Sequence, residues 1–406
     1  MPARYFYGWN VVAATFVMAM LSFGLGFYGL TVVVAVLQSL HGWSASAVSA
    51  PITAYYVAGA LLTTRMGHLY ERFGPRAMVA GGAIAMAVGL GALGVVARPW
   101  QLYPAFLVMS IGWGAMSGAA INIVVAPWFV RRRGLAVSIA FNGATLGGVI
   151  VTPGLILLVD ALGFASALVT AALVLALTLP AVALGVMRRD PAELGLGPDG
   201  DPVPAVAGPG PRSVQRNGAL RTWRFWSVSA PFALGLAAQV GVLTHLVALV
   251  APALGSGGAA RAVSTTTAAA VIGRLATGVV VDRLNRRLVA SATLAVQIVG
   301  VGLLAWPRSA AGVYLGCVLF GLGVGNLTTL PGLILAVEWP RERFAVLIGL
   351  VVGINQLTFA FGPTLVGLLH DWSGNYGPGL MACATLQAIA ATIVLLGPGR
   401  ARTSGA

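Results

Sequence analysis

The sequence has few charged residues and no lysine. Charged residues make up 8% of its 406 positions, against about 25% in a soluble domain, and hydrophobic residues make up 58%. This composition excludes an ordinary soluble protein and predicts a polytopic membrane protein. The two cysteines, Cys317 and Cys383, both lie in apolar runs, which is typical of small buried side chains. We therefore expect neither a disulfide, a metal nor a cofactor.

Acidic residues are equally scarce, and none of the ten lies deep in an apolar run. The net charge of +14 comes from arginines at the ends of apolar runs, so it indicates topology rather than nucleic-acid binding. The chain also lacks a nucleophile with a base, or a metal cluster, that would face a cavity. The sequence thus predicts a membrane protein that is not an enzyme.

Apolar runs of spanning length, separated by glycine, proline and charged turns, predict an all-α fold with twelve transmembrane helices. The first run is longer than the core of a signal peptide and has no convincing cleavage site, so we interpret it as a retained helix. The twelve predicted spans cover residues 9–37, 45–70, 77–97, 101–127, 134–160, 164–187, 223–252, 262–281, 287–306, 310–338, 344–370 and 377–397.

Arginine placement predicts the orientation of these spans. With the amino terminus in the cytoplasm, 19 arginines fall at cytoplasmic ends and three on the opposite side. This bias predicts that both termini lie in the cytoplasm. We expect a multi-pass protein of a bacterial cell membrane. A proline-rich connection divides the chain into a six-helix bundle over residues 1–187, a linker over 188–221, a second bundle over 222–397 and a tail over 398–406.

Arg274 is the most informative single residue. It is the only charge between Ala262 and Val281, and a guanidinium in a spanning helix costs about 2.5–3.5 kcal/mol on insertion scales. No acidic residue within a span is available to neutralise it. We therefore expect Arg274 to bind an anionic substrate, near the midplane and between the two halves.

A motif repeats in the two halves. Residues 67–76 read GHLYERFGPR and residues 278–287 read GVVVDRLNRR, each at the end of a spanning run. The paired segments resemble the cytoplasmic loop motif of the major facilitator superfamily. The resemblance implies two pseudo-symmetric six-helix bundles and a role in gating for residues of the motif, namely Gly67, Glu71, Arg72, Gly278, Asp282 and Arg283.

Further segments are similar to the monocarboxylate transporter and oxalate/formate antiporter group of that superfamily. They are Tyr7-Gly8-Trp9, residues 128–136 (WFVRRRGLA), residues 188–196 (RRDPAELGL) and Gly273-Arg274-Leu275. The resemblance implies that Arg274 binds a substrate carboxylate. Two departures matter: Ala270 stands where proton-coupled members tend to have an acid, and Asn355 and Gln356 stand where oxalate-type exchangers add a second cation. One central cation favours a monocarboxylate.

Other polar residues complete the expected site. Tyr28 follows a glycine-rich stretch that loosens the first helix, and amides at pocket depth are further candidates, namely Asn122, Asn142, Asn326, Asn355 and Gln356. His245 is the candidate proton carrier. The sequence therefore predicts a monomeric transporter of small monocarboxylates in the lipid bilayer, coupled to protons. An anion exchanger and a facilitator that exports another organic solute stay open as alternatives.

Overall fold

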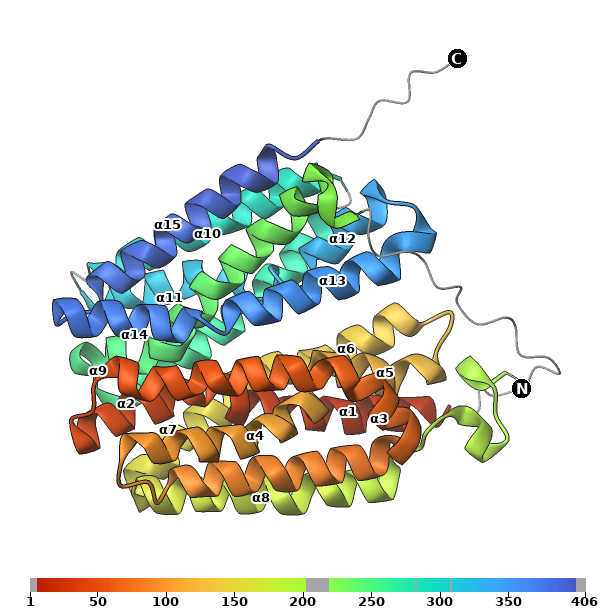
Figure 1. Ribbon diagram of the computed structural model, residues 1–406, viewed down its shortest axis with the longest axis horizontal. Coiled ribbons are helices and arrows are strands. Elements are labelled where there is room, and N and C mark those ends of the chain that lie inside the picture. Colours follow the sequence, from red (N-terminus) through yellow and green to blue (C-terminus); the bar gives the residue numbers. More distant parts are fainter. Residues whose placement is uncertain (1–5, 202–218, 282, 307–308, 399–406) are drawn as a thin grey trace. The chain divides into compact units, whose positions relative to one another are not determined.

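The computed structural model describes residues 6–201, 219–281, 283–306 and 309–398, and the regular secondary structure of this part is helical (Figure 1). The longer helices are α1 (Gly8–Phe23), α2 (Leu30–His41), α3 (Ala45–Leu93), α4 (Leu102–Met116), α5 (Gly118–Val125), α6 (Arg133–Leu146), α7 (Thr152–Leu162), α8 (Phe164–Val186), α9 (Trp223–Val280), α10 (Arg286–Ala305), α11 (Ala310–Val324), α12 (Leu330–Glu338), α13 (Arg341–Phe359), α14 (Gly362–Ser373) and α15 (Gly377–Leu395).

The twelve predicted spans can be traced along these helices. Nine helices of the described part are long and apolar enough to cross a membrane. Two of them contain two spans each, because α3 bends at Gly74 and α9 at Gly255, with φ of 75° and 68°. Glycine adopts this region without the steric cost that other residues have. The short helices α11 and α12 together form the remaining span, which confirms the predicted fold class.

The described backbone packs into two compact units. Unit 1 comprises the described parts of Met1–Trp43, Ala54–Gly210 and Ser256–Ser264. Unit 2 comprises those of Ser44–Thr53, Pro211–Gly255 and Thr265–Ala406. The first turns of α3 therefore pack with the carboxyl-terminal helices, and the first turns after the bend of α9 pack with the amino-terminal ones. The domain boundaries expected from the sequence, at 187 and 222, stay a prediction.

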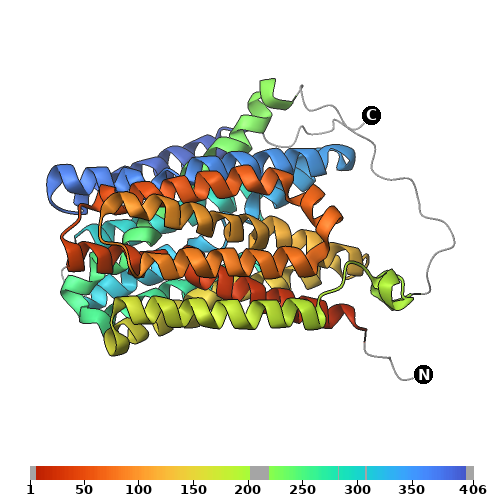
Figure 2. The same ribbon diagram turned by 60° about the horizontal axis from the view of Figure 1, so that its bottom comes forward.

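Glycines allow helices of unit 1 to approach closely. A Cβ atom on Gly143 or Gly147 would overlap the backbone oxygen of Phe16 or Met20, so α1 and α6 touch backbone to backbone. Alongside them, α8 runs as one continuous helix even though Pro180 lies inside it (Figures 1 and 2). Unit 2 has its own apolar core around Phe225, Phe232 and Leu294.

The start of the expected linker is folded against unit 1. Asp199, in the left-handed region at φ 58°, accepts hydrogen bonds from the backbone N–H groups of Val130 and Arg131 at 2.9 and 2.8 Å. Although burial alone raises the pKa of Asp199, these N–H groups and the Arg131 charge hold its pKa below the ordinary value. The first residues of the connection are thus attached to the loop before α6.

Candidate substrate-binding site

Arg274 lies on α9, half-buried, where the helix packs against α11. The contact depends on two glycines. A Cβ on Gly273 would overlap the backbone oxygen of Leu322, and a Cβ on Gly325 would lie 2.8 Å from Nε and 3.0 Å from Nη2 of Arg274. The guanidinium therefore lies against bare backbone that only glycine provides.

The span that faces Arg274 is broken at this point. The helix α11 ends at Val324, turns follow from Gly325, and α12 begins at Leu330. Interrupted spans that expose backbone polar groups are a feature of substrate and ion sites in transporters. The single helix expected over residues 310–338 is therefore interrupted. The signals of the break in the sequence are Gly325, Asn326 and Pro331 in one short stretch.

Asn326 lies in the break and holds it to α9. Only 2% of Asn326 is exposed, and its Nδ2 donates to Thr277 Oγ1 at 2.8 Å and to Leu322 O at 3.1 Å. A longer bond of 3.4 Å joins Nδ2 to Gly273 O. Because Gly273 and Thr277 flank Arg274 on α9, Asn326 holds the broken span next to the arginine. The structure thus brings two of the predicted site residues together.

A second break occurs at the matching place in the other half. Between α4 and α5, Ser117 has an extended backbone with ψ −174°. Ser117 and Thr328 are separated by 211 residues, the same offset as Gly67 and Gly278. Asn122 follows this break, exposed, and its amide donates to Gly118 O at 3.0 Å. Both halves therefore interrupt the corresponding helix.

The first span is loosened where the sequence indicated. Residues Gly24–Tyr28 form a π-helix, which is often a mark of functional sites, and a second one covers Gly147–Val151. The two are joined by Thr152 Oγ1, which donates to Gly24 O at 3.0 Å. Tyr28 is buried, with 8% exposed, and Asn142 is exposed on α6.

An aromatic cluster surrounds the first π-helix. The rings of Phe27 and Trp113 are stacked with centroids 6.0 Å apart, and Tyr56 meets Trp113 edge-on. Tyr55 donates its hydroxyl to Gly26 O at 2.9 Å. This cluster was not predicted, because aromatic residues in apolar runs do not by themselves indicate which of them meet.

His245 lies on α9 of unit 2 and is 2% exposed. Its Nε2 is 3.0 Å from Pro363 O, which makes Nε2 the donor and leaves Nδ1 as an acceptor. No described group donates to Nδ1. The ring of Tyr376 lies close to both His245 and His370, with centroid distances of 5.4 and 4.3 Å. No pattern in the sequence indicates these neighbours.

Asp371, next to His370, holds the start of α3. Its two carboxylate oxygens accept from the backbone N–H groups of Ala45 and Ser46, each at 2.8 Å. A carboxylate at a helix amino terminus satisfies free N–H groups and complements the helix dipole. The group that includes His245, Tyr376 and His370 is therefore continuous with the junction between α3 and α14.

Asn355 and Gln356 lie on α13. Asn355 is 5% exposed and Gln356 is half-buried. The Oδ1 atom of Asn355 has no hydrogen-bond partner in the described part of the chain.

The motif residues expected to act in gating lie just before the bend of α3 and around the end of α9. Gly67, Glu71, Arg72, Gly278 and Arg283 are exposed, and Asp282 lies outside the described residues. A Cβ on Gly67 or Gly278 would meet no described atom within 4 Å, so neither motif glycine lies against another described helix in this arrangement. Glu71 forms no ion pair with a described residue.

Two other motif arginines donate hydrogen bonds to backbone carbonyls at the end of the last helix of each half. Arg76 Nε donates to Met187 O at 2.8 Å, and Arg287 Nη1 donates to Val394 O at 2.9 Å. Arg287 also forms a two-pronged ion pair with Glu338, with N–O distances of 2.7 and 2.8 Å. Arg76 and Arg287 occupy the same place in the repeat, a signal that could have identified them.

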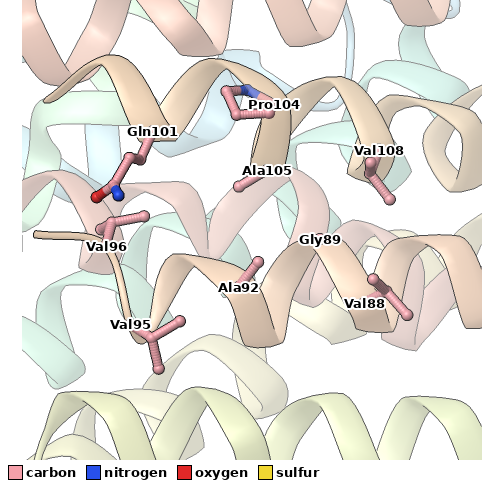
Figure 3. A pocket seen from close by; sticks show the side chains of 9 residues that line it. All are labelled: Val88, Gly89, Ala92, Val95, Val96, Gln101, Pro104, Ala105 and Val108. Atoms are coloured by element: carbon pink, nitrogen blue, oxygen red, sulfur yellow. The ribbon is translucent and has the colours of Figure 1, made fainter. Parts of the chain in front are cut away.

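A cavity of 280 Å³ lies elsewhere, between the end of α3 and the start of α4 (Figure 3). Its lining is apolar except for Gln101, and it contains none of the predicted site residues. It is therefore a feature separate from the surroundings of Arg274.

Several helices are of spanning length. Two of them bend at glycine, and one span is interrupted beside a charged residue. These features define a multi-pass α-helical membrane protein. The model of the Major Facilitator Superfamily matches residues 15–363 and 254–405. The chain belongs to this superfamily of membrane transporters.

Individual relatives are more distant. Monocarboxylate transporter 11 of Mus musculus is 28% identical over 98% of this chain and 89% of its own length. Monocarboxylate transporter 13 of Bos taurus is 28% identical over 91% and 84%. The agnestins efflux protein AgnL12 of Paecilomyces divaricatus is 26% identical over 78% and 70%. The crystal structure of the nucleoside transporter NupG has the same fold, with a TM-score of 0.73, 13% identity and coverage of 96% and 98%.

Proposed function

We propose that the protein is a secondary active transporter of small monocarboxylate anions of the lactate, pyruvate and formate type, working by alternating access. The observation that carries the proposal is Arg274, a cation in an apolar span, held against Gly325 at a helix break. A guanidinium donates two parallel hydrogen bonds and matches one carboxylate. The likeness to two monocarboxylate transporters supports the same substrate class.

Other residues have subsidiary roles in this proposal. The amides of Asn326, Asn355 and Gln356 and the polar groups of Tyr28, Asn122 and Asn142 contact the substrate in the course of transport. The two repeated motifs gate the cytoplasmic side. The protein acts as a monomer in a bacterial cell membrane. Both of its termini lie in the cytoplasm, an orientation that the arginine bias supports.

The test of this function is uptake into proteoliposomes. Radiolabelled lactate, pyruvate and formate are offered separately, beside a cationic dye, with protein-free liposomes as control. Saturable uptake of one or more carboxylates, and none of the dye, is the expected result. Uptake of the dye without any carboxylate would overturn the proposal.

Proton coupling through His245 gives a separate prediction. The Nδ1 atom of this buried histidine is an acceptor without a described donor, so it can take up a proton that accompanies the anion. In a His245→Ala variant we expect the acceleration by an inward proton gradient to disappear, while exchange of internal for external substrate persists.

The measurement compares empty and substrate-loaded liposomes at two external pH values. The exposed His68 on α3 provides a matched control, because His68→Ala should keep the acceleration. If the parent protein is stimulated by internal substrate alone, it is an anion exchanger, and proton symport is eliminated.

Export of another organic solute is the second candidate. The likeness to an efflux protein favours it, although that protein is only 26% identical. The two candidates differ in the ligand: an exporter of an uncharged solute would not need Arg274. Counterflow with everted vesicles therefore separates them, because only a carboxylate carrier loses transport when Arg274 is replaced.

A further inference from the structure

The cavity between α3 and α4 has a defined physical origin. A Cβ on Gly89 would lie 2.6 Å from Ala105 O and 2.7 Å from Met109 Cβ, so the two helices cross in backbone contact at this glycine. Beyond the crossing the side chains that separate them are small, Ala92 and Ala105. Figure 3 shows Ala92 and Ala105 in the middle of the cavity, with Val88 and Val108 at one end and Gln101 at the other.

The rim of this cavity is exposed and apolar. Val88 is 58% exposed, Val95 75% and Val108 37%. The neighbouring exposed side chains of the same two helices are apolar as well, namely Ile84, Leu107 and Ile111. A continuous apolar face on a multi-pass membrane protein lies against lipid chains, because water would make such a face costly. The groove is therefore filled from the bilayer.

Polar and aromatic groups mark one end of the groove. Gln101 Oε1 accepts from the backbone N–H groups of Ala97 and Arg98 at 2.7 and 2.9 Å, which fixes the loop between α3 and α4. Arg98 is exposed and forms no ion pair with a described residue. Trp100 and Tyr103 are 62% and 42% exposed. Exposed tryptophan and tyrosine beside an arginine are typical of the level of lipid headgroups.

We propose that this groove binds one phospholipid with an anionic headgroup. One acyl chain lies between α3 and α4 along Val88, Ala92 and Val108, and the phosphate is paired with Arg98. The volume of 280 Å³ suits part of a chain, since an apolar cavity of about 150 Å³ already holds a benzene molecule. The site does not depend on which solute the protein carries.

Native mass spectrometry of the full-length protein tests the proposal. The purified protein is delipidated and titrated with an equal mixture of phosphatidylglycerol and phosphatidylcholine. We expect one tightly held lipid per chain, with phosphatidylglycerol preferred. In Ala92→Leu the larger side chain fills the groove, so lipid occupancy should fall at least fivefold. Ala181→Leu adds the same bulk at an exposed position of α8 and should leave occupancy unchanged.

Further variants distinguish the contribution of the headgroup to lipid binding from that of the acyl chain. Arg98→Gln should retain a lipid but lose about fivefold in preference for phosphatidylglycerol, whereas Arg98→Lys should keep it. Val108→Phe fills the groove from α4, so the test does not depend on the folding of a single variant. Equal lipid retention in Ala92→Leu, Val108→Phe and the parent would overturn the proposal. A parent dimer that Ala92→Leu converts to a monomer would show that a second copy covers the groove, and would overturn it too.

Discussion

Replacement of Arg274 by glutamine is expected to weaken carboxylate binding severely while the protein stays folded. Loss of one partner of a desolvated charge pair costs about 2–5 kcal/mol, so affinity should fall roughly 30-fold or more. Folding should survive, because the shorter glutamine fits the space above Gly325 and removes a charge from the membrane. Arg274→Lys should give an intermediate loss, since lysine retains the charge but cannot donate the paired hydrogen bonds.

Binding of a radiolabelled monocarboxylate to purified protein, by scintillation proximity, measures this effect. Arg65, exposed on α3, supplies a matched control, and Arg65→Gln should bind as the parent does. Substrate affinity in Arg274→Gln equal to that of the parent, with an unchanged melting temperature, would refute the assignment.

Removal of the Glu338 carboxylate is expected to have the largest effect on stability. The side chains of Arg287 and Glu338 are 5% and 9% exposed, and Arg287 also donates to Ser227 and Val394, so the pair connects α9, α10, α12 and α15. Glu338→Ala leaves a buried guanidinium without its anion, which costs about 3–5 kcal/mol. The melting temperature should therefore fall strongly.

A thiol-reactive fluorophore reports this unfolding, because Cys317 and Cys383 are both buried until unit 2 opens. The matched control is Asp201→Ala, which breaks the exposed pair with Arg131 and should change the melting temperature far less. A double variant, Arg287→Met with Glu338→Leu, should recover much of the loss, since no unpaired charge remains. A melting temperature in Glu338→Ala equal to that of Asp201→Ala would contradict the stabilising role of the Arg287–Glu338 pair.

The spans could be predicted because length and apolarity alone determine them. A run such as 164–187 has no competing structure in a bilayer, and α8 covers Phe164–Val186. The bends were harder. Gly74 bends α3 at φ 75°. Asn285, at the same position of the second motif, instead caps α10 by accepting a hydrogen bond from the backbone N–H of Arg287. The same motif position therefore has two different local structures.

The surroundings of Arg274 could be predicted only in part. An isolated arginine in an apolar run is visible in the sequence. The break at Gly325 instead depends on contacts with α9, whose residues lie about 50 positions away in the sequence. For the same reason the pairing of Arg287 with Glu338, 51 residues away, and the neighbours of His245 were not foreseen. Sequence patterns identify the unusual residue, and packing determines its partner.

The most direct test of the central claim is a distance between the substrate and Arg274 in a lipid bilayer. Protein labelled with ¹⁵N-arginine binds lactate, or whichever monocarboxylate it transports, labelled with ¹³C at the carboxylate carbon, and solid-state NMR measures the dipolar coupling between them. A carboxylate held by the guanidinium places this carbon within about 4 Å of the arginine nitrogens, and the coupling should vanish in Arg274→Lys. Bound substrate whose carboxylate carbon shows no coupling to arginine in the parent protein would contradict the account.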